Sequence, residues 1–142
     1  MAEACSNSRA RRAYLPRIAP VKHCLIVDDS DVIRKVAGLL LADYGFETSE
    51  AVHGQDALEQ CIARMPDVIL LDWHMPVMAG MEFISSLRLQ KNGDMPHIIY
   101  CTTDYDPQDI ARALAAGADD FLLKPFDRDG LRAKVSEFKT AA

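Results

Sequence analysis

Short apolar segments alternate along the chain with helical patterns, and this alternation restricts the fold more than any other feature of the sequence. The apolar segments are His23–Val27, Phe46–Val52, Val68–Leu71, His97–Cys101 and Asp120–Leu123. Between them, apolar residues recur at helical spacing, and Gly45 and Gly117 are placed to end helices. Strands that alternate with helices form a parallel sheet with right-handed crossovers. The sequence therefore predicts one α/β domain of (βα)5 type.

The order of the strands follows from the second apolar segment. Residues Phe46–Val52 mix apolar and polar types and alternate more than they run apolar, whereas the other segments are mainly apolar. Alternation is typical of a strand with one exposed face, so this strand is expected at an edge of the sheet. The predicted order is 2-1-3-4-5, a doubly wound sheet whose switch point lies between strands 1 and 3, where such sheets bind ligands.

Polar residues stand at the ends of four of these strands. Asp28 and Asp29 follow the first strand and Asp72 follows the third, while Thr102 and Lys124 follow the fourth and fifth. Strands 1 and 3 flank the switch point, so the three carboxylates are expected in one crevice. Their mutual repulsion requires a cation, and a site made only of oxygen ligands suits Mg²⁺. The sequence thus predicts a Mg²⁺ site at this edge.

The same residues have the chemistry of phosphoryl transfer. This reaction needs charge neutralisation and a nucleophile in line with the leaving group, and little else from a protein. Lys124 supplies a point charge and Thr102 a hydroxyl donor. The Asp72 carboxylate can attack phosphorus to give an acyl phosphate, which water can hydrolyse.

Composition limits the remaining possibilities. Of 142 residues, 49% are apolar and 26% charged, which suits one globular domain rather than a disordered chain. Residues 1–20 hold four arginines and no apolar periodicity, and we interpret them as a flexible Arg-rich arm before a domain at 21–142. The net charge of −5 makes the domain acidic and argues against nucleic-acid binding.

The sequence also gives expectations for location and cysteine state. It contains no apolar run long enough to insert into a membrane and no signal-peptide pattern. The four cysteines have no metal-ligand spacing, so we expect reduced thiols and a cytoplasmic protein.

Several motifs, in this order, resemble the receiver domain of two-component response regulators. They are LIVDDS, LLDWHMPVMAG, YCTT and ALAAGADDFLLKPF, and the resemblance extends from about Val21 to Phe138. In having no appended output domain, the sequence is similar to single-domain response regulators of the chemotaxis type. The resemblance implies the flavodoxin-like receiver fold.

The resemblance also implies roles for the residues at the strand ends. Asp72 would accept a phosphoryl group from the phosphohistidine of a histidine kinase or histidine phosphotransferase. Asp29, Asp72 and the backbone carbonyl of His74 would bind Mg²⁺ directly, and Asp28 would act largely through water. Thr102 and Lys124 would contact the phosphoryl oxygens, and the Lys124-Pro125 bond would be cis, as proline permits.

Signalling in the family implies further roles. Thr102 would shift toward the phosphoryl group, and Phe121 would turn inward as the switch aromatic. His74 and Asp104 would tune the phosphoryl lifetime, and a histidine can change charge near neutral pH. A downstream protein would bind the face of helix 4, strand 5 and helix 5, for which the expected surface residues are Gln108, Arg112, Arg128 and Arg132. The chain is expected to be a monomer or a weak phosphorylation-dependent dimer.

Other readings explain the sequence less well. An aspartate-nucleophile phosphohydrolase would need a second aspartate where His74 stands, as well as a cap domain. An FMN-binding relative of flavodoxin would need a phosphate-binding first loop, which the acidic loop at residues 28–31 opposes. A phosphorylation-independent interaction module would not need the complete set of site residues. We therefore expect a signalling phosphoacceptor that catalyses only its own phosphorylation and dephosphorylation, not an enzyme with an external substrate.

Overall fold

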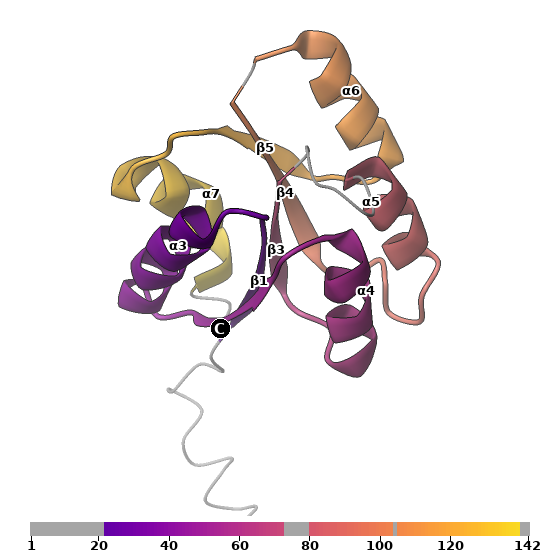
Figure 1. The fold of residues 1–142 in the computed structure, drawn as a ribbon, viewed down its shortest axis with the longest axis horizontal. Coiled ribbons are helices and arrows are strands. Elements are labelled where there is room, and N and C mark those ends of the chain that lie inside the picture. Colours follow the sequence, from indigo (N-terminus) through magenta and orange to yellow (C-terminus); the bar gives the residue numbers. More distant parts are fainter. Residues whose placement is uncertain (1–21, 73–79, 104, 140–142) are drawn as a thin grey trace, which may run out of the picture.

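A five-stranded parallel sheet forms the centre of the protein (Figure 1). The computed structural model describes residues 22–72, 80–103 and 105–139. Within them the strands are β1 (His23–Val27), β2 (Glu47–Ala51), β3 (Val68–Asp72), β4 (His97–Thr102) and β5 (Asp120–Leu123). They pair in the order β2-β1-β3-β4-β5, and every pair is parallel. The predicted fold class and strand order are confirmed.

Helices cover both faces of the sheet. On one face lie α3 (Asp31–Asp43) and α7 (Arg128–Lys139). On the other lie α4 (Gly54–Ala63), α5 (Gly80–Arg88) and α6 (Pro107–Ala116). The crossover from β1 to β2 runs across the sheet in the opposite direction from the three later crossovers. Because all crossovers are right-handed, α3 lies on one face of the sheet and α4, α5 and α6 lie on the other.

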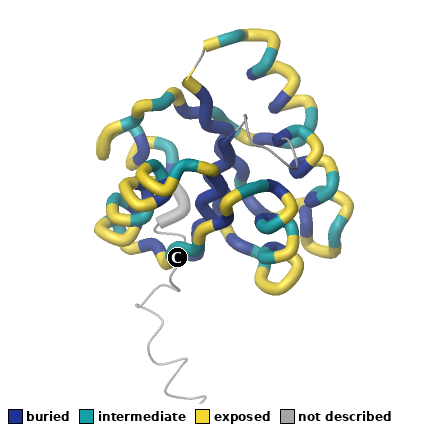
Figure 2. Tube along the Cα trace, in the orientation of Figure 1, coloured by how far each residue is buried: buried dark blue, intermediate teal, exposed yellow. Residues whose placement is uncertain are grey.

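The core consists of two layers, one on each side of the sheet. Every residue of β1 and β3 is buried, whereas β2 is half exposed as an edge strand (Figure 2). Alternate residues of a strand point to opposite faces, so Leu25 and Val27 pack toward α4 and α5 while Cys24 and Ile26 pack toward α3 and α7. A strand buried on both faces has little freedom to shift its register, which fixes where its last residue lies.

The helices begin and end where the sequence indicates. Ser30 caps α3, and its hydroxyl accepts a hydrogen bond from the N–H of Ile33 at 3.3 Å. Asp106 caps α6 and is followed by Pro107 at the first helical position. Gly117, which follows α6, has a φ of +126°, a conformation that glycine adopts without strain.

The buried faces of two helices differ in part from the predicted ones. The helical spacing of apolar residues predicts Ile62 and Leu114 on buried faces, but they are exposed at 59% and 44%. Smaller residues of these helices face the sheet, namely Ala57, Cys61 and Ala113, and in α3, where the pattern predicts Val36 or Ala37, it is Ala37 that is buried. Small side chains let a helix lie close to the sheet, and the large ones then reach only its rim. In α3 the buried face also includes Arg34, which the apolar pattern did not predict.

Three cysteines lie in the described part of the chain, and all are free and buried as predicted: Cys24, Cys61 and Cys101. Cys5 lies outside it, as does the arm at residues 1–20. Among the described helices, none has both the length and the apolar character to cross a membrane.

His23 is a buried histidine at the start of β1. Its Nε2 lies 2.8 Å from the Ser49 hydroxyl, and its Nδ1 has no hydrogen-bond partner among the described residues. Burial, assisted by the charge of Arg64, lowers the pKa of His23 below its ordinary value of 6.5. Folding therefore favours the neutral ring.

This predicts a pH-dependent contribution of His23 to stability. Below about pH 6.5 the unfolded chain takes up a proton that the folded chain resists, so the contribution is present above that pH and is lost as the pH falls toward the folded-state pKa. We expect the difference in unfolding free energy between wild type and His23→Gln, measured by urea denaturation, to be constant above about pH 7.5 and to shrink below about pH 6.5. A difference that stays the same down to about pH 5 would contradict this account.

Candidate functional site

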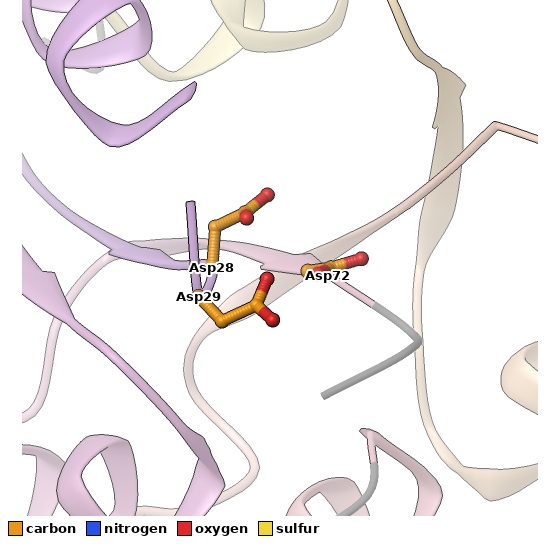
Figure 3. A group of neighbouring side chains, drawn as sticks. All are labelled: Asp28, Asp29 and Asp72. Atoms are coloured by element: carbon orange, nitrogen blue, oxygen red, sulfur yellow. The ribbon is translucent and has the colours of Figure 1, made fainter. Parts of the chain in front are cut away.

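Three carboxylates meet at the carboxyl edge of the sheet, between the ends of β1 and β3 (Figure 3). Asp72 is the last residue of β3, and Asp28 and Asp29 follow β1. One oxygen from each lies within 4.8 Å of the others. Asp28 and Asp72 are buried and Asp29 is exposed. The structure thus brings together the three acidic residues that the strand order placed in one crevice.

Lys124 places a positive charge between two of these carboxylates. Its Nζ donates to Asp28 Oδ2 at 3.1 Å and to Asp72 Oδ1 at 3.2 Å. Burial opposes the charge of Lys124, but the hydrogen bond that Lys124 donates to Asp28 and the charges of both aspartates outweigh this effect and raise the pKa of Lys124. Lys124 therefore remains charged in this crevice.

A backbone hydrogen bond joins Lys124, which follows β5, to the end of β4. The Lys124-Pro125 bond is cis, as the resemblance implied. The N–H of Lys124 donates to the carbonyl oxygen of Thr102 at 2.7 Å, which ties the ends of β4 and β5 together. Thr102 is 1% exposed and ends β4 beside the end of β3.

Asp28 is held from several sides. Its Oδ1 accepts a hydrogen bond from the N–H of Ser30 at 2.9 Å, while Oδ2 accepts from Lys124. Its own N–H donates to the carbonyl oxygen of Ala51 at 3.1 Å. Ser30 also caps α3, and its backbone contact with Asp28 depends on how the turn after β1 folds. Asp28 is thus a fixed member of the cluster.

Cys101 is a potential rival nucleophile, because it pairs with Asp72 across β3 and β4. It is 4% exposed, and burial raises the pKa of its thiol to about 12. A thiol that stays protonated is a poor nucleophile. Cys101 is therefore a poor candidate for a nucleophile at this edge, where the carboxylates lie.

Phe121, the expected switch aromatic, lies half-buried on β5. Its ring centroid is 6.1 Å from that of Tyr105, and the ammonium group of Lys134 lies 5.2 Å from the centre of the Phe121 ring. His74 and Asp104, the expected lifetime-tuning residues, lie outside the described residues.

Two arginines expected on the output face contact α3 instead. Arg128 donates to Asp43 at 2.7 Å, and the Arg132 guanidinium lies 4.9 Å from the centre of the Tyr44 ring. Helix α7 packs beside α3 on the same face of the sheet, so these two side chains bridge that pair of helices. The prediction that Arg128 and Arg132 belong to the face of α6, β5 and α7 placed them on the wrong side of α7.

The donor set fits a hard divalent cation. Three carboxylates supply only oxygen atoms, within a span that one ion can bridge, and one of them faces solvent. Mg²⁺ prefers such ligands and keeps several waters, so a half-open acidic cluster suits it better than a closed cage. The nearby ammonium group can hold an anionic group beside the ion.

Comparison with known proteins assigns this arrangement to a family. The family model described as the response regulator receiver domain matches residues 24–136. Among curated relatives, the phosphate regulon transcriptional regulatory protein PhoB of Escherichia coli is 34% identical over 115 residues, which are 80% of this chain and 50% of that protein. Transcriptional regulatory protein PrrA of Mycobacterium tuberculosis is 39% identical over 112 residues, 78% of this chain and 46% of that protein. The chain spans about half the length of these relatives.

Solved structures agree with this assignment. Chemotaxis protein CheY4 of Vibrio cholerae superposes with a TM-score of 0.80 at 34% identity, covering 83% of this chain and 98% of that one. The receiver domain of sensor histidine kinase PA1611 from Pseudomonas aeruginosa, solved with a magnesium ion coordinated in its active site cleft, has a TM-score of 0.78 at 28% identity and covers 86% of this chain and all of that one. The chain belongs to the response regulator receiver domain family of two-component systems.

Proposed function

We propose that the chain is a Mg²⁺-dependent phosphoacceptor, in which Asp72 receives a phosphoryl group from the phosphohistidine of a histidine kinase or histidine phosphotransferase. The observation that carries the proposal is the position of Lys124, whose Nζ bonds to both Asp28 and Asp72 at the open edge of the sheet. A lysine that served only to stabilise the fold through an ion pair would need one carboxylate and no further acid beside it. Three clustered acids, two of which accept from one lysine, suit a site for a cation and an anion together.

The transfer forms one bond and breaks one. An oxygen of the Asp72 carboxylate attacks phosphorus, the phosphorus–nitrogen bond breaks, and the imidazole leaves with the electron pair and takes up a proton. Lys124 then contacts a phosphoryl oxygen in place of a carboxylate, and the Thr102 hydroxyl donates to another. Water later hydrolyses the acyl phosphate, which returns Asp72 to its carboxylate form.

A Mg²⁺ ion would be held by Asp29, Asp72 and the backbone carbonyl of His74, with Asp28 acting largely through water. Bound there, the ion neutralises charge that develops on the phosphoryl oxygens. The exposure of Asp29 and the fixed position of Asp28 support this division of roles. We also propose that His74 and Asp104 set the lifetime of the acyl phosphate, as residues two positions after Asp72 and Thr102.

The output that we propose is a protein contact on the face of α6, β5 and α7, switched by Thr102 and Phe121. Phe121 is only half-buried, with Tyr105 and Lys134 against its ring, which supports a change of rotamer at this position. One structural neighbour, whose chain is covered at 98%, is a chemotaxis protein. The curated relatives named as transcriptional regulators are matched over about half their length.

The repulsion within the acidic cluster gives a first prediction. In Asp29→Asn one of three neighbouring charges is lost, so we expect the metal-free variant to melt about 2–4 °C above wild type. We expect added Mg²⁺ to raise the melting temperature of wild type and to have little effect on the variant. Thermal unfolding followed by circular dichroism, with and without Mg²⁺, measures both effects.

The control is Asp43→Asn, because Asp43 is an exposed carboxylate of α3 paired with Arg128 away from the cluster. This variant should keep the full stabilisation by Mg²⁺. Equal stabilisation of wild type and Asp29→Asn would show that the ion binds elsewhere.

Phosphorylation itself gives a second prediction. With Mg²⁺ and acetyl phosphate or phosphoramidate, intact-mass spectrometry should detect one added phosphoryl group that is stable in acid and labile in base, as an acyl phosphate is. Asp72→Ala should remove the added mass, and Asp43→Ala should keep it. Modification that persists in Asp72→Ala, or no modification of wild type with either donor, would refute the proposed function.

A further inference from the structure

Arg34 is a charged side chain on the buried face of α3, one turn after the acidic loop. It is only 7% exposed. Its Nη1 donates to the backbone carbonyl oxygen of Asp28 at 2.6 Å, and its Nε donates to Glu50 on β2 at 2.9 Å. Its Nη2 bonds to Asp31 in the first turn of the same helix. One guanidinium therefore joins the end of β1, the edge strand and the start of α3.

The contact with Asp28 acts on the backbone that carries Asp29. The carbonyl group of Asp28 belongs to the peptide unit that links it to Asp29, and this unit is planar. Fixing the carbonyl oxygen fixes the plane, and the plane sets the direction in which the chain enters Asp29. The side chain of Asp28 is held separately by Ser30 and Lys124, so Arg34 controls the part of the loop that those bonds leave undetermined.

The positive charge of Arg34 would weaken, rather than strengthen, the binding of a cation at the acidic cluster. A positive group this close to the acidic cluster repels Mg²⁺, although Glu50 and Asp31 offset much of its charge. An arginine kept here solely for its charge would weaken the site. Any contribution of Arg34 to cation binding must therefore come from the way it positions the loop backbone. The rigid fork of a guanidinium is suited to this task, and the flexible side chain of lysine is not.

We propose that Arg34 is a positioning residue for the divalent-cation site, which orients the peptide unit between Asp28 and Asp29 so that the Asp29 carboxylate faces the Asp72 carboxylate. This inference rests on the proposed function, because it assumes that the acidic cluster binds Mg²⁺. It adds a residue outside the cluster, on the buried face of α3, to the parts that set the affinity for the ion.

The test measures Mg²⁺ affinity of the unphosphorylated protein by isothermal titration calorimetry, with urea denaturation of the same samples. Arg34→Lys keeps the charge and loses the fork, and we expect it to weaken Mg²⁺ binding by about tenfold. Arg34→Gln removes the charge as well and should also weaken binding, although the loss of repulsion alone would tighten it. The two variants thus separate geometry from charge.

Arg64→Lys is the matched control. Arg64 also pairs with a glutamate of β2, through two bonds of 2.8 Å to Glu47, but it does so at the other end of the strand. The Arg64→Lys variant should lose the two-bond pairing with Glu47 and keep the Mg²⁺ affinity of wild type.

The outcomes are distinguishable. Wild-type or tighter Mg²⁺ affinity in both Arg34 variants, with a lowered free energy of unfolding, would overturn the inference and leave Arg34 a purely structural residue. If wild type itself bound no Mg²⁺, both the proposed function and the inference would fail. If the Arg34 variants did not fold, Glu50→Ala would serve instead, since it removes the side-chain oxygen that accepts from Arg34 Nε. At high salt, where charge effects are screened, it should still weaken binding, and unchanged affinity would overturn the inference.

Discussion

The repulsion among three carboxylates at one sheet edge is the constraint on which the rest of the structure depends. Two of them, Asp28 and Asp72, are buried, and unpaired buried charges are costly. The ammonium group of Lys124 offsets part of this repulsion by bonding to both. One lysine cannot neutralise three acids, so the site keeps a net negative charge that favours a divalent cation. A cation and an incoming phosphoryl group together complete the balance of charge.

The fold holds the charged groups of this site in fixed positions relative to one another. Strands β1 and β3 are neighbours buried on both faces, so their registers are fixed and Asp28 and Asp72 end at the same level of the sheet. Strand β5 lies two places away from β3, and Lys124 spans β4 to reach the acids. The backbone bond from Lys124 to Thr102 keeps the ends of β4 and β5 aligned. Each site residue thus takes its position from a strand rather than from a free loop, except Asp29, whose placement we attribute to Arg34.

Most of the strands and the positions of the site residues could be predicted because four strands end at a residue whose chemistry differs sharply from the apolar run before it. The predicted segment at residues 68–71 and Asp72, for example, is β3 itself. The helix faces could not be predicted in the same way. Ile62 and Leu114 fitted an apolar stripe, yet Cys61 and Ala113 lie against the sheet, because distance to the sheet rather than apolar character decides the inner face. The contacts of Arg34 depend on three elements meeting in space, which the spacing of residues along the chain does not reveal.

The most direct test of the account is a crystal structure of the protein grown with Mg²⁺ and beryllium fluoride, which mimics a phosphoryl group on a carboxylate. We predict that beryllium bonds to a carboxylate oxygen of Asp72, that Mg²⁺ lies beside it with Asp29 as a ligand, and that Lys124 Nζ leaves the two carboxylates to contact fluorine. Beryllium fluoride on a different carboxylate, or Mg²⁺ bound away from Asp29 and Asp72, would contradict the claim that these residues form one phosphoacceptor site.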